Sequence, residues 1–389
     1  MDITLQPGKL SGTVTVPPSK SIAHRMLICA ALSDKPTDLF CAETSEDIEA
    51  TAQALKQLCH YVGRTPYGYE VCPYQYDGDA GPDSLWIRCR ESGSTLRFLL
   101  PIVGALGIET AFEMEGRLPQ RPLSPLWEEM ERMGCKLFWE ADTVLRCTGK
   151  LKPGRYCING SVSSQFISGL MMALPLIDGE SSLEITGNIE SMPYVDMTAR
   201  VLERFYQDRP EQLSVEGDWS SGAFWLAANA LGSNIRVDGL PEDSVQGDKA
   251  VAYWLPKLQE RVTISAKDIP DLVPILAVVA AANKGAVFTD IARLRLKESD
   301  RVAAIIAMLE NLGGKTEATE HTLTVYGSGL SGGVVDGFND HRIAMSAAIA
   351  ATVCSEPVTI IGAECVKKSY LKFWEDYAHL GGKYEKHLR

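Results

Sequence analysis

Hydrophobic and polar positions alternate along this chain in a recurring order of short strand-like runs and longer Ala/Leu/Ile/Met-rich segments. Six times, a short apolar or turn segment leads into a cluster of Ser, Gly, Asp or Asn that opens directly into an apolar helical segment. The six junctions are Pro18–Ser21, Glu91–Thr95, Ser161–Gln165, Asp218–Ser221, Asp268–Asp271 and Asn339–Arg342. This pattern predicts six helix starts, each with unpaired N–H groups and the positive end of the helix dipole.

The segments around the junctions also recur, which predicts a repeated α/β unit. Three apolar helices are predicted to end alike, with a C-cap glycine at Gly134, Gly313 and Gly381. The junctions are spaced by roughly 73, 71, 56, 51 and 70 residues, so two repeats are short. In those two, residues 204–216 and 257–266 leave little room for a strand pair. Either these repeats have lost a hairpin, or loop residues are missing from the sequence.

Length and composition allow two ordinary globular domains. The chain has 389 residues, of which 45 % are hydrophobic and 23 % charged. Its start lacks the basic and apolar regions of a secretory signal, and its most apolar run is too short to cross a bilayer, so we expect no membrane association. The ten cysteines occur singly and the six histidines form no metal-binding pattern. We therefore expect reduced core thiols, a cytoplasmic protein and no metal or organic cofactor.

The net charge of −12 argues against nucleic acid as a partner. An acidic chain that binds anions must gather its cations locally, and basic residues do recur at the junctions and in neighbouring loops. A single junction by itself is most simply an ordinary N-cap, and a single basic residue is most simply part of a solvated face. Recurrence favours a shared anion-binding site built from helix N-termini and cations. The basic residues in question are Lys20, Arg25, Arg97, Arg117, Arg121, Arg295, Lys297, Arg301, Arg342, Lys367 and Lys368.

Four stretches give the chain a specific resemblance. They are Pro18–Ser21 with Arg25, Gly160–Phe166, Leu296–Arg301 and Asn339–Met345. In this order they resemble the 5-enolpyruvylshikimate-3-phosphate (EPSP) synthases, which are 3-phosphoshikimate 1-carboxyvinyltransferases. The resemblance runs from the first predicted strand to the last predicted helix.

The resemblance implies an α/β (α+β) fold of two similar domains. Each domain would contain three repeated βαβαββ-type units with buried parallel helices, and a cleft would lie between the domains. One domain would comprise residues 1-18 plus 217-389, and the other, residues 19-216, would be inserted into it. The first strand would then belong with the C-terminal half of the chain. The resemblance also implies a monomer.

The implied reaction joins shikimate 3-phosphate to phosphoenolpyruvate and releases inorganic phosphate. Both substrates are anions, so several cations are needed to hold them together, because each charge-assisted hydrogen bond contributes only about 1.5–3 kcal/mol. By resemblance, the phosphoenolpyruvate contacts fall on Lys20, Gly93, Arg121, Gln165, Arg301, Arg342 and Lys368. The shikimate 3-phosphate contacts fall on Ser21, Arg25, Ser163, Ser164, Gln165, Ser191, Asp271 and Lys297.

We assign Asp271 to accept the proton of the attacking hydroxyl and Glu298 to protonate the vinyl methylene. Lys20 would polarise the phosphate bridge, and His341 and Lys368 are secondary catalytic candidates. General acid–base help of this kind supplies about 10²–10⁴-fold in rate. Simpler interpretations exist: Glu298 and Arg301 as a surface pair on a helix, Asp271 as a helix cap, and His341 as a core histidine.

Three features depart from the family pattern. Glu91 stands where the family usually has Asn, Ser94 replaces a commoner Thr, and Met192 replaces a frequent Lys. One alternative function is the related enolpyruvyl transfer to UDP-N-acetylglucosamine, but that enzyme uses a Cys in the loop that corresponds to Glu115–Arg121, which has none here. The other is a catalytically silent paralogue that only binds an anionic metabolite.

Overall fold

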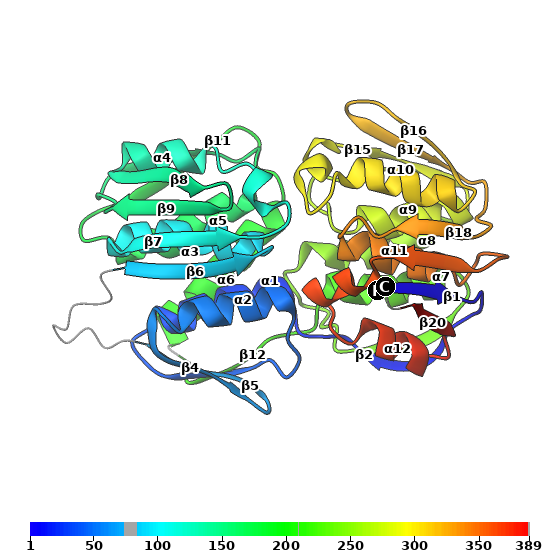
Figure 1. Ribbon diagram of the computed structural model, residues 1–389, viewed down its shortest axis with the longest axis horizontal. Helices are drawn as coiled ribbons and strands as arrows, with labels where there is room; N and C mark the ends of the chain where they lie inside the picture. Colours follow the sequence, from blue (N-terminus) through cyan, green and yellow to red (C-terminus); the bar gives the residue numbers. More distant parts are fainter. Residues whose placement is uncertain (74–83, 209, 388–389) are drawn as a thin grey trace. The chain divides into compact units, whose positions relative to one another are not determined.

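The chain forms two compact units in the computed structural model, which describes residues 1–73, 84–208 and 210–387. The terminal unit comprises Met1–Ser19 with Glu216–Arg389, and the inserted unit comprises Lys20–Val215 (Figure 1). These limits lie within one residue of the domain limits at 18/19 and 216/217 that the sequence suggests. Both units mix helices and strands, as an α/β fold requires.

The inserted unit contains three sheets. Its helices are α1 (Lys20–Ala31), α2 (Glu46–Leu55), α3 (Gly93–Leu106), α4 (Leu126–Arg132), α5 (Ser164–Ala173) and α6 (Met192–Asp208), with short 3₁₀ turns η1 (Leu118–Gln120) and η2 (Leu174–Leu176). Its strands are β3 (Thr37–Phe40), β4 (Cys59–Thr65), β5 (Gly68–Pro73), β6 (Ser84–Arg90), β7 (Glu109–Met114), β8 (Cys135–Ala141), β9 (Val144–Gly149), β10 (Arg155–Asn159), β11 (Ser182–Thr186) and β12 (Gln212–Ser214). They pair in the orders β12-β3-β5-β4, β6-β7-β9-β8 and β10-β11.

The terminal unit has the same organisation. Its helices are α7 (Trp219–Ala230), α8 (Val251–Lys257), α9 (Val273–Ala282), α10 (Arg301–Asn311), α11 (His341–Ala350) and α12 (Phe373–His379), with 3₁₀ turns η3 (Gly247–Ala250), η4 (Ala292–Leu296) and η5 (Ala363–Lys368). Its strands are β1 (Asp2–Leu5), β2 (Ser11–Thr15), β13 (Asn234–Asp238), β14 (Val262–Ser265), β15 (Gly285–Thr289), β16 (Lys315–Ala318), β17 (Thr322–Tyr326), β18 (Gly333–Asp336), β19 (Val358–Ile361) and β20 (Tyr384–His387). They pair in the orders β14-β15-β17-β16, β18-β19-β1-β20 and β13-β2.

The strand pairing confirms the repeated unit. Each four-stranded sheet begins with a parallel pair and continues with two antiparallel pairings, as in β6-β7-β9-β8 and β14-β15-β17-β16. The N-terminal strand β1 completes one of these sheets by pairing antiparallel with both β19 and β20. The first strand therefore does belong with the C-terminal half of the chain.

The described residues of the two short repeats keep the parallel strand pair and form no hairpin. The sheets β10-β11 and β13-β2 are parallel and two-stranded. Among the described residues, α6 ends at Asp208 and β12 begins at Gln212, while α8 ends at Lys257 and β14 begins at Val262. Each helix therefore leads directly into the first strand of the next repeat.

Buried helices form the centre of each unit. In α9, every residue from Val273 to Ala281 is buried, which fits an uninterrupted run of Val, Ile, Leu, Ala and Pro, because a helix that is apolar on all sides must be covered on all sides. Helices α7 and α11 pack against α9 in the terminal unit, and α3 packs between α1 and α5 in the inserted unit. The six predicted junctions all open into these central helices.

Four of the six junctions supply a side-chain N-cap. The residues Ser92, Ser163, Asp218 and Asp340 accept hydrogen bonds from the backbone N–H of Thr95, Gln165, Ser221 and Arg342, respectively. Helix α9 differs, because its N-cap is Leu272, which offers no side-chain hydrogen bond. Asp271 is therefore not a helix cap, and its carboxylate is engaged elsewhere.

The three predicted glycine caps are confirmed. Gly134, Gly313 and Gly381 have φ values of 116°, 85° and 91° and follow the last turns of α4, α10 and α12. In the latter two helices the next glycine completes the motif, with Gly314 N–H donating to Leu309 and Gly382 N–H to Tyr377. Glycine is favoured at such positions because it has no Cβ to clash in the left-handed region.

All ten cysteines are free thiols, and most lie in the core as the sequence suggests. Two do not: Cys72 is half-buried and Cys157 is exposed, since they occupy outward-facing positions of the strands β5 and β10. Within the described part of the chain, no helix is both long and apolar enough to cross a bilayer.

The contact between α3 and α5 depends on Gly169. A Cβ at this position would lie 2.3 Å from the backbone oxygen of Arg97, and backbone cannot move aside as a flexible side chain does. We expect Gly169→Ala to lower the free energy of unfolding by about 1–3 kcal/mol, despite the better helix propensity of alanine. Urea unfolding curves would measure this, with Gly8→Ala as the control, because no atom lies within 4 Å of the place that a Cβ of residue 8 would occupy. Equal midpoints for the two variants would contradict this packing.

Candidate active site

In the inserted unit, predicted site residues lie at the N-termini of three central helices. Lys20 begins α1, Gly93 begins α3, and Ser164 begins α5, directly after its N-cap Ser163. Side-chain hydrogen bonds link these helix starts to one another. The unit therefore gathers several positive helix ends, which is an arrangement suited to anions.

Gln165 joins the starts of α3 and α5. Its Oε1 accepts from Nη1 of Arg97 at 2.8 Å, and its Nε2 donates to Oγ of Ser94 at 3.0 Å. Arg97 Nη2 also donates to the carbonyl of Pro122 at 3.0 Å, which holds the segment that carries Arg121. The Gln165 amide thus has a fixed orientation, because its oxygen faces the Arg97 donor and its nitrogen faces the Ser94 acceptor.

Two guanidinium groups converge on Gly93. A Cβ at this position would lie 2.9 Å from Nη1 of Arg121 and 3.1 Å from Nη1 of Arg97. The absence of a side chain at Gly93 therefore leaves room for both arginines beside the first turn of α3. Two cations of the predicted set therefore lie beside one helix start.

Lys20 is fixed by an acid on a different helix. Its Nζ lies 2.9 Å from Oδ2 of Asp47 in the first turn of α2, and both side chains are largely buried. The next residue, Ser21, is half-buried, and its carbonyl accepts from Nη1 of Arg25 at 2.7 Å. The start of α1 is also linked to that of α3 by a relay from His24 through Thr51 and Thr95 to Ser92, with each step 2.7 Å long.

Arg25 points into the core of the inserted unit. It is 2 % exposed, and its guanidinium donates to the carbonyls of Ser21 and Tyr194 and to the hydroxyls of Thr198 and Ser168. These bonds connect α1 to α5 and α6. In this arrangement four of the five N–H groups of Arg25 hold the fold together, so a substrate contact depends on the remaining one.

The predicted serines near α5 and α6 are buried. Ser163 and Ser164 are 8 % and 4 % exposed, at the cap and first position of α5. Ser191 is 2 % exposed, precedes α6 and has φ of 57°, an unusual value for a residue with a side chain. Such local strain is found mainly where a fixed side-chain or backbone direction is required.

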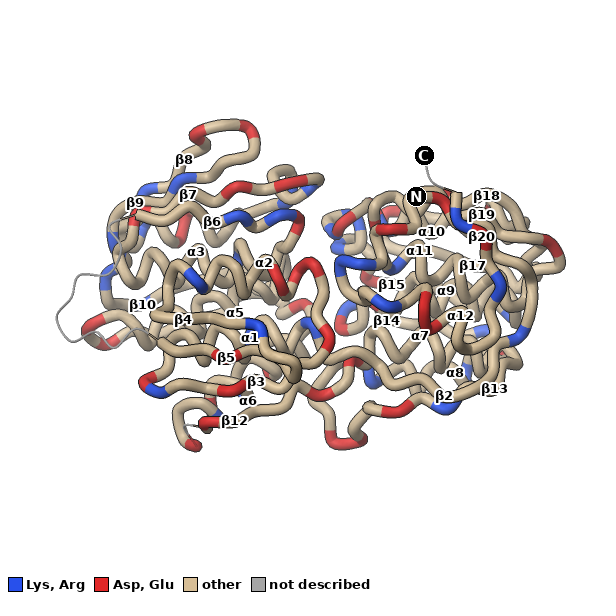
Figure 2. The backbone as a smooth tube through the Cα atoms, turned by 60° about the horizontal axis from the view of Figure 1, so that its bottom comes forward, with Lys and Arg blue, Asp and Glu red and all other residues tan. Residues whose placement is uncertain are grey.

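In the terminal unit, five predicted residues form one ion-pair cluster around Asp271. Oδ1 of Asp271 lies 2.6 Å from Nη1 of Arg301 and 3.3 Å from Nζ of Lys297, and Oδ2 lies 3.4 Å from Nη2 of Arg342. Glu298 accepts from Arg301 Nη2 at 2.8 Å. Lys and Arg positions gather along the tube beside α10 and α11 of this unit (Figure 2). These five residues, which the resemblance assigns to substrate binding or catalysis, therefore lie in one cluster.

Arg301 is the most deeply enclosed member of this cluster. It is 1 % exposed and contacts Asp271, Glu298 and the fully buried Asp340, whose Oδ2 lies 2.9 Å from Arg301 Nε. Glu298 lies before α10 and not within it. The alternative of a Glu298–Arg301 surface pair on a helix is therefore wrong.

The charges around Asp271 control its protonation. Burial alone raises the pKa of Asp271, but Lys297, Arg301 and Arg342 together outweigh burial and hold the pKa well below its usual value. Burial also lowers the pKa of Lys297, although Asp271 opposes that effect. Asp271 is therefore a carboxylate at neutral pH, which is the form that can accept a proton.

Arg342 differs from Arg301 in the donors it retains. Its Nε and Nη1 are buried and have no hydrogen-bond partner among the described residues, while Nη2 is 3.4 Å from Asp271. Its neighbour His341, the first residue of α11, is 2 % exposed, and Lys368 Nζ donates to the carbonyl of Asn339 at 2.7 Å. His341 and Lys368 therefore both lie at the start of α11, beside Arg342.

The three departures from the family pattern lie in different surroundings. Ser94 accepts the hydrogen bond from Gln165, so its hydroxyl retains a site function. Glu91 lies against Gly116, where a Cβ would be 2.4 Å from Glu91 Oε2. Met192 begins α6 and is 39 % exposed, so a Lys at this position would not be a buried cation.

Sequence reasoning gave no specific role to three residues that hold the site together, although it counted Arg97 among the basic residues near the junctions. Arg97 orients Gln165, Asp47 pairs with Lys20, and Asp340 pairs with Arg301 while it caps α11. The sequence offered a signal for Asp340, because Asp is a common N-cap residue and stands directly before a predicted helix. It also offered one for Arg97, which follows the second junction. Asp47 had none, because its contact with Lys20 joins separate helices.

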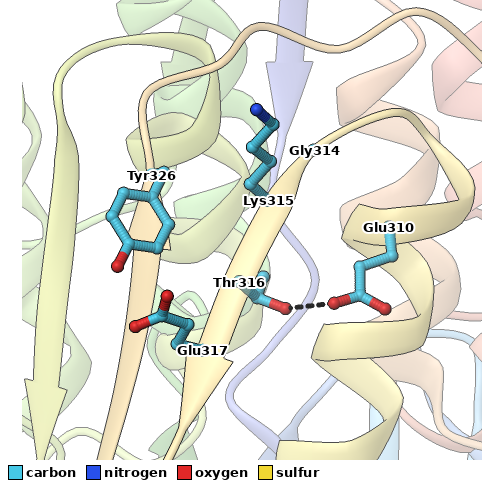
Figure 3. A pocket seen from close by; sticks show the side chains of 6 residues that line it. All are labelled: Glu310, Gly314, Lys315, Thr316, Glu317 and Tyr326. Atoms are coloured by element: carbon cyan, nitrogen blue, oxygen red, sulfur yellow. Dashed lines mark hydrogen bonds between the residues drawn. The ribbon is translucent and has the colours of Figure 1, made fainter.

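A separate open pocket of about 590 Å³ lies between the end of α10 and the strands β16 and β17 (Figure 3). In it, Thr316 donates to Glu310 at 2.8 Å, and Tyr326 lies beside Glu317. None of the predicted substrate-binding residues lines this pocket.

The fold is that of the two-unit enolpyruvyl transferases. EPSP synthase from Acinetobacter baumannii superposes with a TM-score of 0.80 at 23 % identity, covering 99 % of this chain and 100 % of that one. The enolpyruvyl transferase NikO from Streptomyces tendae superposes with a TM-score of 0.75 at 17 % identity, covering 99 % and 98 % of the two chains. These likenesses establish the fold.

The sequence comparisons are more specific. The profile of the family described as EPSP synthase (3-phosphoshikimate 1-carboxyvinyltransferase) matches residues 5–268 and 259–377. Proteins named 3-phosphoshikimate 1-carboxyvinyltransferase from Clostridium kluyveri and Clostridium acetobutylicum are 39 % and 38 % identical, each aligned over 98 % of this chain and 97 % of its own length. The chain belongs to the EPSP synthase family. The first of these alignments spans 424 positions, more than the 389 residues present, consistent with the two short repeats.

Asp340 connects this cluster to the start of α11. It is fully buried and accepts from Ser299 Oγ, Arg301 Nε and the backbone N–H of Arg342. Because Asp340→Ala would leave Arg301 without part of its counter-charge, we expect the free energy of unfolding to fall by about 3–5 kcal/mol. Urea unfolding followed by tryptophan fluorescence would measure the loss. Asp243→Ala, at an exposed position, is the control, and a loss no larger than the control's would refute this role for Asp340.

Proposed function

We propose that this protein transfers the enolpyruvyl group of phosphoenolpyruvate to the 5-hydroxyl of shikimate 3-phosphate and releases inorganic phosphate. This is the reaction for which its relatives are named. The observation that best supports it here is the cluster in which Lys297, Arg301 and Arg342 surround an ionised Asp271, with Glu298 alongside. Such a cluster supplies a base, a second carboxyl group and cations for anionic substrates.

The cations answer the main physical difficulty of the reaction. Both substrates carry a carboxylate and a phosphate, so bringing them together opposes like charges. In our proposal, phosphoenolpyruvate is bound by Lys20, Gly93, Arg121, Gln165, Arg301, Arg342 and Lys368. Shikimate 3-phosphate is bound by Ser21, Arg25, Ser163, Ser164, Gln165, Ser191, Asp271 and Lys297. Arg342 is suited to bind phosphoenolpyruvate, because its buried Nε and Nη1 groups have no hydrogen-bond partner among the described residues. A planar guanidinium edge of this kind fits a carboxylate or phosphate with two parallel bonds.

The chemical steps follow from the carboxyl groups. Asp271 accepts the proton of the 5-hydroxyl of shikimate 3-phosphate. The oxygen of this hydroxyl attacks the carbon of phosphoenolpyruvate that bears the phosphate. Glu298 gives a proton to the vinyl methylene, which forms a tetrahedral intermediate. This intermediate then loses phosphate while its methyl group returns a proton to Glu298, so that the double bond of the enolpyruvyl group forms again. Lys20 stabilises the departing phosphate, while His341 and Lys368 serve as secondary proton carriers. Bound substrate anions also offset the cations around Asp271, which makes this carboxylate more basic when it is needed.

The expected monomeric state and cytoplasmic location belong to the same proposal. The free thiols, eight of them buried, are consistent with a reducing compartment.

A coupled assay for inorganic phosphate tests the reaction and its two alternatives. We expect release when phosphoenolpyruvate is supplied with shikimate 3-phosphate, and no release when UDP-N-acetylglucosamine is the acceptor. The reverse result would identify the related transferase, which is disfavoured by the absence of Cys from Glu115–Arg121. Calorimetric binding of shikimate 3-phosphate without release from either acceptor would identify a silent paralogue.

Asp271→Asn tests the role of the base. Asparagine keeps the shape of the side chain but cannot take up the hydroxyl proton, so we expect kcat to fall by about 10²–10⁴-fold. Calorimetry should still detect binding of shikimate 3-phosphate, and Asp243→Asn is the exposed control. If binding disappears together with turnover, Asp271 holds the ligand and another group is the base.

A further inference from the structure

The terminal unit contains a buried acid that the mechanism above does not use. Asp248 lies in η3 and is 2 % exposed. Its Oδ2 accepts a hydrogen bond from Oγ of Ser220 in the first turn of α7, and its Oδ1 has no hydrogen-bond partner among the described residues. A buried carboxyl group with one oxygen left unbonded is costly, so its presence calls for an explanation.

The backbone around Asp248 is held firmly. Two residues earlier, Gln246 accepts from the backbone N–H of Trp219 at 3.0 Å and from the Ser19 hydroxyl at 3.1 Å. Its amide nitrogen donates to the Gly217 carbonyl at 2.8 Å and to Glu216 at 2.6 Å. These bonds, together with the bond from Ser220 to Asp248, tie the segment that carries Asp248 to the start of α7.

The charged groups that act on Asp248 come from three neighbouring segments. Burial raises the pKa of Asp248 to about 7, and the negative charge of Asp271 before α9 adds to this effect. Arg342 of α11 and the Ser220 hydroxyl oppose it, while Asp218 at the cap of α7 raises the pKa further. On α8, which follows η3, the titratable side chains Tyr253 and Lys257 are exposed.

Arg342 has unbonded hydrogen-bond donors, whereas Asp248 has an unbonded acceptor. It is 2 % exposed, its charge acts on Asp248, and its Nε and Nη1 have no partner among the described residues. Two buried groups of opposite charge that are both under-bonded, yet not hydrogen-bonded to each other, would gain by pairing if the carboxyl group ionised. A neutral carboxyl group attracts the guanidinium far less.

We propose that Asp248 is a positioning residue for Arg342: its neutral form leaves the Nε and Nη1 donors to the anionic substrate, and its ionised form competes for them. The inference rests on the proposed function, in which Arg342 binds phosphoenolpyruvate. It makes the affinity for this substrate depend on pH through a residue that does not touch the substrate.

The pH dependence of the KM for phosphoenolpyruvate tests the proposal on the full chain. Between pH 6 and pH 8 the neutral fraction of Asp248 falls to about a tenth, so we expect KM to rise about tenfold in the unmodified protein. In Asp248→Asn, the ratio of KM at pH 8 to KM at pH 6 should fall severalfold, because asparagine stays neutral. Ionisation of the substrate phosphate affects both proteins and cancels in the comparison. Asp243→Asn, with its exposed side chain, should keep the unmodified ratio.

An unchanged KM ratio in Asp248→Asn would overturn the inference. If KM is also raised by one common factor at both pH values, Asp248 has a purely structural role. A protein that releases no phosphate at any pH would instead refute the proposed function, so the two failures are distinguishable.

Ser220→Ala provides a second variant that leaves the carboxyl group in place. The Ser220 hydroxyl favours the ionised form of Asp248, so its removal should move the rise in KM to higher pH, by about one pH unit for a hydrogen bond of ordinary strength. A shift to lower pH, or no shift, would contradict the proposal even if Asp248→Asn failed to fold.

Discussion

The need to neutralise buried guanidinium groups governs the terminal unit. Arg301 is almost fully buried, and it is stable there because Asp271, Glu298 and Asp340 surround it. These acids come from three separate segments, so a single arginine fixes the turn before α9, the approach to α10 and the start of α11. An uncompensated charge in that position would cost several kcal/mol, and the arrangement of the three segments is therefore strongly determined. The same contacts keep Asp271 ionised.

In the inserted unit, neutral groups accept hydrogen bonds from the Arg97 guanidinium. Gln165 bridges Arg97 and Ser94, and glycines allow close approach at Gly93 and Gly169. Lys20 pairs with the carboxylate of Asp47. Neutral oxygen acceptors therefore hold the Arg97 guanidinium in this unit, whereas acids hold Arg301 in the terminal unit. The proton-transfer candidates Asp271 and Glu298 accordingly lie in the terminal unit, where cations are available to tune them.

The two short repeats show which parts of the repeated unit matter for the site. Both retain their parallel strand pair and the central helix, and both lack the antiparallel hairpin. The N-caps Ser163 and Asp218 belong to these repeats and are intact. The hairpin extends a sheet, while the junction presents the helix start, so a repeat without the hairpin still presents its helix start. Strand β1 is likewise structural, since it closes a sheet with β19 and β20.

The sequence by itself determined the six helix starts, the glycine caps and the repeated unit, because these depend on local backbone preferences and on apolar periodicity. The family resemblance also suggested Asp271, Lys297, Glu298, Arg301 and Arg342 as site residues, in separate substrate-binding and catalytic roles. Only the tertiary structure decided how these charges pair, that Arg25 faces the core, and that Asp47, Arg97, Asp340 and Asp248 complete the network. Those partners lie on segments far apart in the chain. Their pairing depends on burial and distance, which no local pattern encodes.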